Sequence, residues 1–255
     1  MTVILASNNK EENSMNYKNI FERYELKYLL TPKQKDAIFS GMQNYMQGDQ
    51  YQNSTICNIY FDTPDFLLIR RSLEKPLYKE KLRMRSYGIS KPDSTIFVEL
   101  KKKYKSVVYK RRTSMTQSQA EHYLCKGYSL KHSSQITREI DYFCDFYQNL
   151  QPAVFLSYQR EAFSGIYEED LRITFDENIL WRQEQLSLCT GIYGTAILPP
   201  GTTLMEIKTA GAMPLWLTKI LSEHHIYKTS FSKYGKAYEA ILQARLHHTG
   251  GLCYA

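Results

Sequence analysis

Alternating cations in the stretch KEKLRMRSY, residues 79–87, have the types and spacing needed to bind a polyanion. Every second residue is basic: Lys79, Lys81, Arg83 and Arg85. If the stretch is a β-strand, these four side chains share one face, because side chains alternate between faces along a strand. A solvated surface is the commonest reason for one basic strand. The alternative is an enclosed surface for phosphate, since Arg binds phosphate oxygens in a bidentate manner and Lys supplies a compact charge.

Other segments repeat this division into one apolar face and one face that carries Lys or Arg. In residues 21–30, Arg23, Glu25 and Lys27 occupy one face, and Tyr and Leu occupy the other. The same division is found in residues 95–103, 153–163, 171–178 and 203–209. On an open sheet such cations would repel one another, at about 1 kcal/mol per close pair in water and about 4 kcal/mol near a protein surface. We therefore expect a closed antiparallel β-barrel, a tunnel with a basic interior whose apolar exterior is covered by helices.

Carboxylates on these basic faces occur in three copies of a Glu-x-Lys pattern. The copies are Glu25-Leu-Lys27, Glu99-Leu-Lys101 and Glu206-Ile-Lys208. Carboxylates among cations suit a hard divalent ion, Mg²⁺ or Mn²⁺, that bridges protein oxygens and phosphate oxygens. Cross-strand ion pairing explains the same pattern, and the residues leave both interpretations open. The candidate metal ligands are Glu206, Glu99 and Glu25.

The elements that must position these residues follow from periodicity and from capping residues. Strands are predicted at 21–30, 55–62, 77–87, 95–103, 107–115, 153–163, 171–178 and 203–209. Thr31 and Pro32 begin one predicted helix, and a capping box of Thr116 and Gln119 begins another that ends near Gly127. Further helices are predicted at 63–74, 134–149, 212–224 and 232–246. Strands with helices between and after them are typical of an α+β fold with an antiparallel sheet.

Composition and charge narrow the class of protein. The 255 residues suffice for one large domain, and the formal net charge of +7 favours an acidic partner. The five cysteines are odd in number and form no C-x-x-C pair, which indicates reduced thiols and a cytoplasmic protein. The sequence contains neither a signal peptide nor an apolar stretch that approaches 18 residues, so we expect no membrane span in this chain.

Eight motifs together resemble a known family. In chain order they are RYELKY, LRMRSY, FVELKKK, YKRR, SYQREAF, LRITFDENI, MEIKT and FSKYGKAY. They resemble the VTC domain, the polyphosphate polymerase domain of the triphosphate tunnel metalloenzyme (CYTH-like) superfamily. The resemblance covers about residues 19–243. We therefore predict a VTC-type domain at 19–246 and a C-terminal tail at 247–255, preceded by a flexible N-terminal arm at 1–18, which is polar.

The resemblance implies an enzyme that transfers the γ-phosphate of ATP to a growing polyphosphate chain with Mn²⁺ or Mg²⁺. By position, the family's phosphate-binding cations fall on Lys27, Arg83, Arg85, Lys101, Arg160, Arg172 and Lys233, and its metal-binding glutamate falls on Glu206. Further candidate phosphate contacts are Arg23, Lys110, Arg112, Lys208 and Ser232. Ser232 and Lys233 lie at a predicted helix start, where N–H groups bind anions. The residues expected to be catalytic are Lys27, Arg83, Arg85, Lys101 and Glu206.

Three alternatives to a polymerase remain open at this stage. A tripolyphosphatase or nucleoside triphosphatase of the same fold differs little in these motifs. Arg23 stands where the wider superfamily has the first glutamate of E-x-E-x-K, which favours the polymerase. A non-catalytic polyphosphate binder would not need Glu206. A nucleic-acid partner is not expected, because a tunnel admits a slim chain but not a duplex. Eukaryotic members join a Lys-rich sensor and membrane helices to this domain, so we expect any membrane or regulatory partner to be separate.

Overall fold

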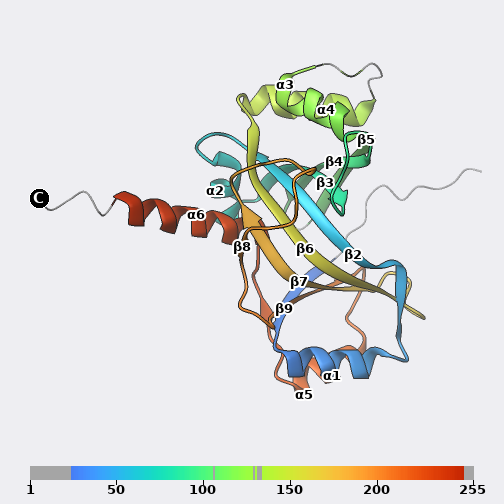
Figure 1. Cartoon of the computed structure of the whole chain (residues 1–255). Coiled ribbons are helices and arrows are strands. Elements are labelled where there is room, and N and C mark those ends of the chain that lie inside the picture. The colour runs from blue at the N-terminus through green and yellow to red at the C-terminus, as the bar shows by residue number, and fades with distance from the viewer. Residues whose placement is uncertain (1–23, 106, 129, 131–133, 250–255) are drawn as a thin grey trace, which may run out of the picture.

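A computed structural model describes residues 24–105, 107–128, 130 and 134–249, and it consists of one large antiparallel sheet with helices packed against it (Figure 1). The predicted arm at residues 1–18 and the side chain of Arg23 lie outside the described residues. The last helix continues to Thr249, into the segment predicted as a tail, and residues 250–255 are not described. Where the chain is described, no helix is both long enough and apolar enough to cross a membrane.

The sheet forms a single antiparallel ladder in the order β10-β1-β9-β7-β6-β2-β3-β4-β5, with β8 paired to β7. Its strands are β1 (Tyr24–Leu30), β2 (Met46–Asp62), β3 (Tyr78–Tyr87), β4 (Thr95–Tyr104), β5 (Val107–Thr116), β6 (Gln151–Gly165), β7 (Arg172–Arg182), β8 (Thr195–Ala196), β9 (Thr203–Thr209) and β10 (Lys228–Thr229). The predicted α+β class with an antiparallel sheet is confirmed.

The prediction of a closed barrel is wrong. The ladder ends at β5 on one side and at β10 on the other, and among the described residues no backbone pairing joins these ends. The reason lies at β1, whose outer edge is paired with β10 at Lys27 and Tyr28 and is therefore not available to β5. Side chains approach across the gap instead: Lys101 Nζ on β4 lies 3.5 Å from Glu25 Oε2 on β1. The sheet is thus open, although it curves far enough to bring its two ends close.

Helices pack on both faces of the sheet in three clusters. They are α1 (Pro32–Met42), α2 (Leu67–Leu73), α3 (Gln117–Lys126), α4 (Gln135–Tyr147), α5 (Leu215–Glu223) and α6 (Lys233–Thr249). Figure 1 shows α1 and α5 together at one end of the sheet and α3 and α4 at the other. Buried side chains of these pairs, such as Ile38 and Phe143, pack against strand residues, and α2 and α6 pack near the middle. The α2 and α6 cluster lies on the face of Ile56, Leu156 and Leu204, and the polar remainder of that face forms the site.

Two predicted helix starts are confirmed in detail. The Thr31 and Thr116 side chains accept a hydrogen bond from the third residue of their helices, and each forms the reciprocal capping box. The helix predicted from residue 63 begins later, at Leu67. Its first turn is held by the buried carboxylate of Asp62, which accepts hydrogen bonds from the backbone N–H groups of Leu68 and Ile69.

Candidate functional site: a basic cavity with two carboxylates on one wall

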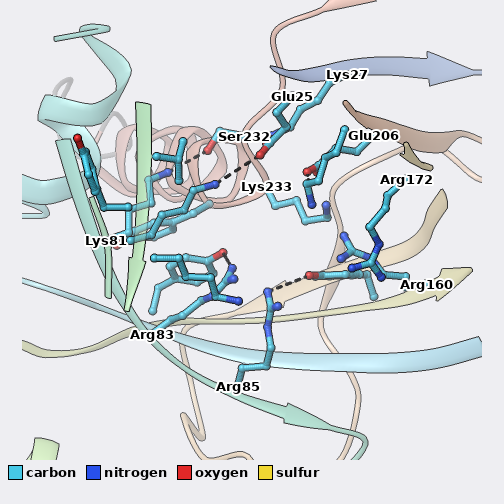
Figure 2. Close-up of a pocket in the computed structure, with 18 of the residues that line it drawn as sticks. Glu25, Lys27, Lys81, Arg83, Arg85, Arg160, Arg172, Glu206, Ser232 and Lys233 are labelled. Atoms are coloured by element: carbon cyan, nitrogen blue, oxygen red, sulfur yellow. Dashed lines mark hydrogen bonds and ion pairs between the residues drawn. The ribbon is translucent and has the colours of Figure 1, made fainter. Parts of the chain in front are cut away.

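A cavity of about 1140 Å³ opens on the polar face of the curved sheet. Strands from both ends of the ladder contribute to it, and Figure 2 shows side chains from several strands and from α6 that converge on it. Its cations are Lys27, Lys81, Arg83, Arg85, Lys101, Lys110, Arg111, Arg160, Arg172, Lys208 and Lys233. Its carboxylates are Glu25 and Glu206, and Tyr60, Tyr109, Tyr158, Tyr234 and Ser232 complete its polar lining. Eleven cations against two carboxylates give the cavity a strongly positive interior.

The structure brings ten of the twelve predicted phosphate contacts together in this cavity. They are Lys27, Arg83, Arg85, Lys101, Lys110, Arg160, Arg172, Lys208, Ser232 and Lys233. Arg23 lies outside the described residues. Arg112 does not line the cavity, because its guanidinium stacks over the Phe97 ring at 4.1 Å and pairs with Glu99. The alternation of side chains along the strands therefore predicted most of the cations that line the cavity.

Glu99 is a buried counter-ion for the cations around it. Its side chain is 1% exposed. Arg83 Nε donates to its Oε2 at 2.8 Å, while Arg112 Nε (2.7 Å) and Lys110 Nζ (2.8 Å) approach its Oε1. Burial opposes the charge of Glu99, but these cations outweigh burial and hold its pKa well below the usual range. Because Glu99 is held by two guanidinium groups and does not line the cavity, it is poorly suited to the metal role that the sequence suggested.

Asp176 has the same function on β7 and was not predicted as a site residue. Its carboxylate is fully buried and accepts a bidentate hydrogen bond from Arg160, at 2.6 and 2.7 Å. Lys233 Nζ lies 2.6 Å from its Oδ2. Burial opposes ionisation of Asp176, but Lys233 and Arg160 outweigh it and lower its pKa. Asp176 thus orients two cavity cations, and its place on the same strand face as Arg172 was the signal that could have identified it.

Lys81, Tyr60 and Tyr158 also line the cavity without having been predicted as site residues. Lys81 belongs to the alternating stretch with Arg83 and Arg85, so the same period of two could have identified it. Tyr60 OH accepts a hydrogen bond from Arg83 Nη1 at 2.9 Å, and Tyr158 OH accepts one from Arg85 Nη2 at 3.4 Å. The two phenols therefore orient the two arginines, a role that depends on cross-strand register rather than on sequence spacing.

Glu25 and Glu206 occupy one wall of the cavity on the paired strands β1 and β9. Lys27 Nζ lies 3.2 Å from Glu25 Oε1, and Lys208 Nζ lies 2.9 Å from Glu206 Oε1. Burial and the charge of Glu206 act to raise the pKa of Glu25, but Lys101, Lys27 and Lys208 outweigh them, so its pKa is lowered. Both carboxylates are therefore ionised at neutral pH and close enough to influence each other.

This pair of carboxylates fits a metal that completes its coordination from the substrate. Within the described residues, no group of three or more Asp, Glu, His or Cys side chains could hold an ion by itself. Mg²⁺ typically binds one or two protein carboxylates and takes its remaining ligands from phosphate and water. The donors present, Glu206 with Glu25, match that requirement, and the surrounding lysines would bind the same phosphates.

Lys81 should make ligand binding depend on pH. Its ammonium is enclosed, and its nearest hydrogen-bond partner is Ser232 Oγ at 3.5 Å. Burial, together with the charges of Lys79 and Lys101, lowers the pKa of Lys81 to about 8. A phosphate chain favours the protonated form, so above about pH 8 the free protein must take up a proton in order to bind. We expect the contribution of Lys81 to affinity to fall by up to about tenfold per pH unit in this range.

The comparison with Lys81→Arg tests this dependence. Arg keeps its charge throughout this range, so the variant should lose less affinity for tripolyphosphate than the wild type between about pH 7 and about pH 9. Titration calorimetry in buffers of different ionisation enthalpy would measure both the affinity and the proton uptake. Protonation of the ligand itself affects both proteins equally, so the difference between their pH profiles reports on the side chain at position 81. Identical pH profiles for the two proteins would contradict a titrating Lys81.

Comparison with known proteins identifies one family and several solved structures of low sequence identity. The model of the VTC domain family matches residues 22–242. A presumed adenylate cyclase from Bacillus halodurans superposes with a TM-score of 0.50 at 16% identity, over 84% of this chain and 95% of that chain. At this identity the similarity shows a shared fold alone.

Two further solved structures have lower scores. One is a presumed adenylate cyclase from Vibrio parahaemolyticus, with a TM-score of 0.46 at 13% identity over 87% of this chain and 99% of that chain. The other is a presumed adenylyl cyclase from Hippeastrum described as having a dominant triphosphatase activity, with a TM-score of 0.48 at 16% identity over 82% of this chain and 92% of that chain. No curated protein sequence matches the chain.

Proposed function

Because this chain belongs to the VTC domain family, we propose that it is a polyphosphate polymerase that transfers the γ-phosphate of ATP to the end of a polyphosphate chain. Family membership supports an activity on polyphosphate or on triphosphates, and the polymerase is the more specific proposal. The observation that carries it is the size and charge of the cavity. Eleven cations line about 1140 Å³, and they outnumber the carboxylates that line the cavity or pair with them, so the space favours a long, highly charged phosphate chain.

In this proposal the cations align a donor and an acceptor. Arg83, Arg85 and Arg160 hold the phosphates of ATP, because each guanidinium is oriented by a buried oxygen and offers its remaining N–H groups to the ligand. Lys27 and Lys233 are candidates for contacts with the acceptor. Alignment of this kind makes a bimolecular transfer nearly unimolecular.

The reaction needs no covalent enzyme intermediate. A terminal oxygen of the acceptor chain, already anionic, forms a bond to the γ-phosphorus of ATP. The bond from that phosphorus to the bridging β–γ oxygen breaks, and ADP leaves with the electron pair. Phosphoryl transfer depends mainly on positioning and charge neutralisation, which the cavity cations supply. A Mg²⁺ or Mn²⁺ ion held by Glu206 and Glu25 would neutralise further charge on the phosphate oxygens.

Product analysis tests this proposal against its alternatives. The purified protein is incubated with ATP and Mn²⁺, with and without short polyphosphate, and the products are separated on a gel stained for polyphosphate. We expect longer chains, and faster ADP release when the acceptor is added. Free phosphate as the only product, formed at a rate indifferent to added polyphosphate, would identify a triphosphatase. Tight binding without turnover would identify a binder and reject the enzyme.

A further inference from the structure

Three successive rows of side chains cross β3, β4 and β5 on the face that bears the cavity. Backbone register defines them as Arg83–Glu99–Arg112, then Lys81–Lys101–Lys110, then Lys79–Lys103–Val108. The first row contains its own carboxylate. The second row contains only lysines, and the third contains two lysines and Val108. Without a carboxylate, the second and third rows are both more positive than the first, and they lie toward the hairpin that joins β4 to β5.

The two lysines of the third row, Lys79 and Lys103, which we call the outer lysine pair, lie next to the lining of the cavity, to which Val108 of the same row belongs. All three lysines of the second row line the cavity, but the outer lysine pair does not. A step of two residues keeps a side chain on the same face and moves it about 6.6–6.8 Å along the strand. The outer lysine pair therefore continues the line of cations out of the cavity mouth, on the same face of the sheet.

The two lysines are directly opposite each other and lack an acidic partner. Like charges at directly paired positions destabilise a sheet. Burial lowers the pKa of Lys79, and the charges of Lys103, Lys101 and Lys27 lower it further, so these ammonium groups lie close enough to repel one another. Lys79 Nζ donates to the carbonyl of Ser72 at 3.3 Å. Within the part of the chain that the structure describes, neither lysine forms an ion pair.

We propose that the outer lysine pair is a further binding site for linear polyphosphate, contacted only by chains that extend beyond the cavity. Bound phosphates would relieve the repulsion within the pair, whereas a triphosphate held in the cavity would not reach it. The site would also fix the path of the long chain, which would leave the cavity along β3 and β4 toward the hairpin that joins β4 to β5. This inference rests on the proposed function for its biological meaning, but its chemistry requires only a phosphate chain.

A charge-matched pair of double variants tests the site. Lys79→Gln/Lys103→Gln removes the outer lysine pair. Lys33→Gln/Lys219→Gln removes the same charge from α1 and α5, at the far end of the molecule (Figure 1). Affinity for tripolyphosphate and for a long linear polyphosphate is measured for both variants and the wild type over a series of salt concentrations.

We expect the Lys79→Gln/Lys103→Gln variant to bind the long chain several-fold more weakly than the wild type. It should bind tripolyphosphate with wild-type affinity. Its plot of log affinity against log salt should also be shallower for the long chain by about one to two units, because fewer counterions are released. The control variant should resemble the wild type with both ligands. The site is refuted if the Lys79→Gln/Lys103→Gln variant binds the long chain with wild-type affinity, or if both variants lose affinity for it equally. It is also refuted if the affinity for tripolyphosphate falls as much as the affinity for the long chain.

Failure of this inference is distinguishable from failure of the proposed function, because binding requires no turnover. A protein that makes no polymer from ATP but shows the length-selective loss would refute the polymerase and retain the site. A protein that makes polymer but shows no length-selective loss would do the reverse. Thermal unfolding of both variants without ligand shows that each is folded under the conditions of the titration.

Discussion

Glu206→Gln is expected to lower metal-dependent turnover by about 100-fold or more, the scale of losing one electrostatic contact in an active site. Gln keeps the size and the hydrogen-bonding capacity of the side chain but removes the charge that a divalent cation needs. Glu206 is 7% exposed on the cavity wall, and its neighbour Glu25 is the only other carboxylate among the lining residues described. The initial rate, measured over a range of Mn²⁺ concentrations, reports the effect.

The free Glu206→Gln protein should also be less stable at neutral pH. Burial opposes the charge of Glu206, but Lys208, Lys27 and Lys233 outweigh it and lower its pKa well below its value in the unfolded chain. A carboxyl group whose pKa is lower in the folded protein than in the unfolded chain stabilises the fold at pH values above its pKa in the unfolded chain. This stabilisation is lost as the pH falls through its pKa in the folded protein. At neutral pH the variant therefore loses this contribution and should melt at a lower temperature.

Two other carboxylates provide controls. Glu25→Gln should weaken the Mn²⁺ dependence of the rate less than Glu206→Gln does, since Lys27 and Lys101 already contact the oxygens of Glu25. Glu99→Gln should leave the Mn²⁺ concentration for half-maximal rate unchanged, because Glu99 contacts only cations. Wild-type Mn²⁺ dependence in Glu206→Gln would contradict the assignment of Glu206 as metal ligand.

Arg83→Ala is the second substitution with a large expected effect. Loss of one charge-assisted contact in the transition state costs about 2–4 kcal/mol, which corresponds to about 30- to 900-fold in kcat/KM. Arg83 is held by Glu99 and by Tyr60 OH, so its guanidinium needs little reordering when a phosphate binds. The fold should remain intact because Glu99 keeps Arg112 and Lys110 as partners.

Arg83→Lys separates charge from geometry at this position. Lys retains the positive charge but not the planar pair of donors, so it should recover only part of the lost activity. Arg138→Ala, at an exposed position of α4, is the matched control and should keep wild-type kcat/KM. If Arg83→Ala turns over ATP as fast as this control while both remain folded, Arg83 has no role in the reaction.

The alternation of side chains along the strands predicted most of the cations that meet in the cavity, with Arg112 as an exception, because alternation is a local property of extended backbone. Closure of the sheet is not local. It depends on whether two edge strands expose free backbone groups to each other, and the short strand β10 occupies that edge of β1. With only two residues, Lys228 and Thr229, β10 has no periodicity that a sequence pattern could detect.

The roles of the inward carboxylates also depended on register. Glu99 and Glu206 both occur in a Glu-x-Lys pattern, and the pattern does not distinguish them. In the fold Glu99 lies between Arg83 and Arg112 on the neighbouring strands, whereas Glu206 is paired across the ladder with Lys27 and Thr174. Glu99 is therefore enclosed by guanidinium groups, and Glu206 has no guanidinium on the paired positions and faces the cavity.

The fate of the γ-phosphate of ATP tests the polymerase most directly. The protein is supplied with ATP labelled at the γ-phosphorus, short polyphosphate and Mn²⁺, and label in chains, label in free phosphate and released ADP are measured in the same sample. Transfer within the cavity predicts that label enters the chains in an amount equal to the ADP released. Label found entirely as free phosphate, again equal to the ADP released, would contradict transfer and show that water is the acceptor.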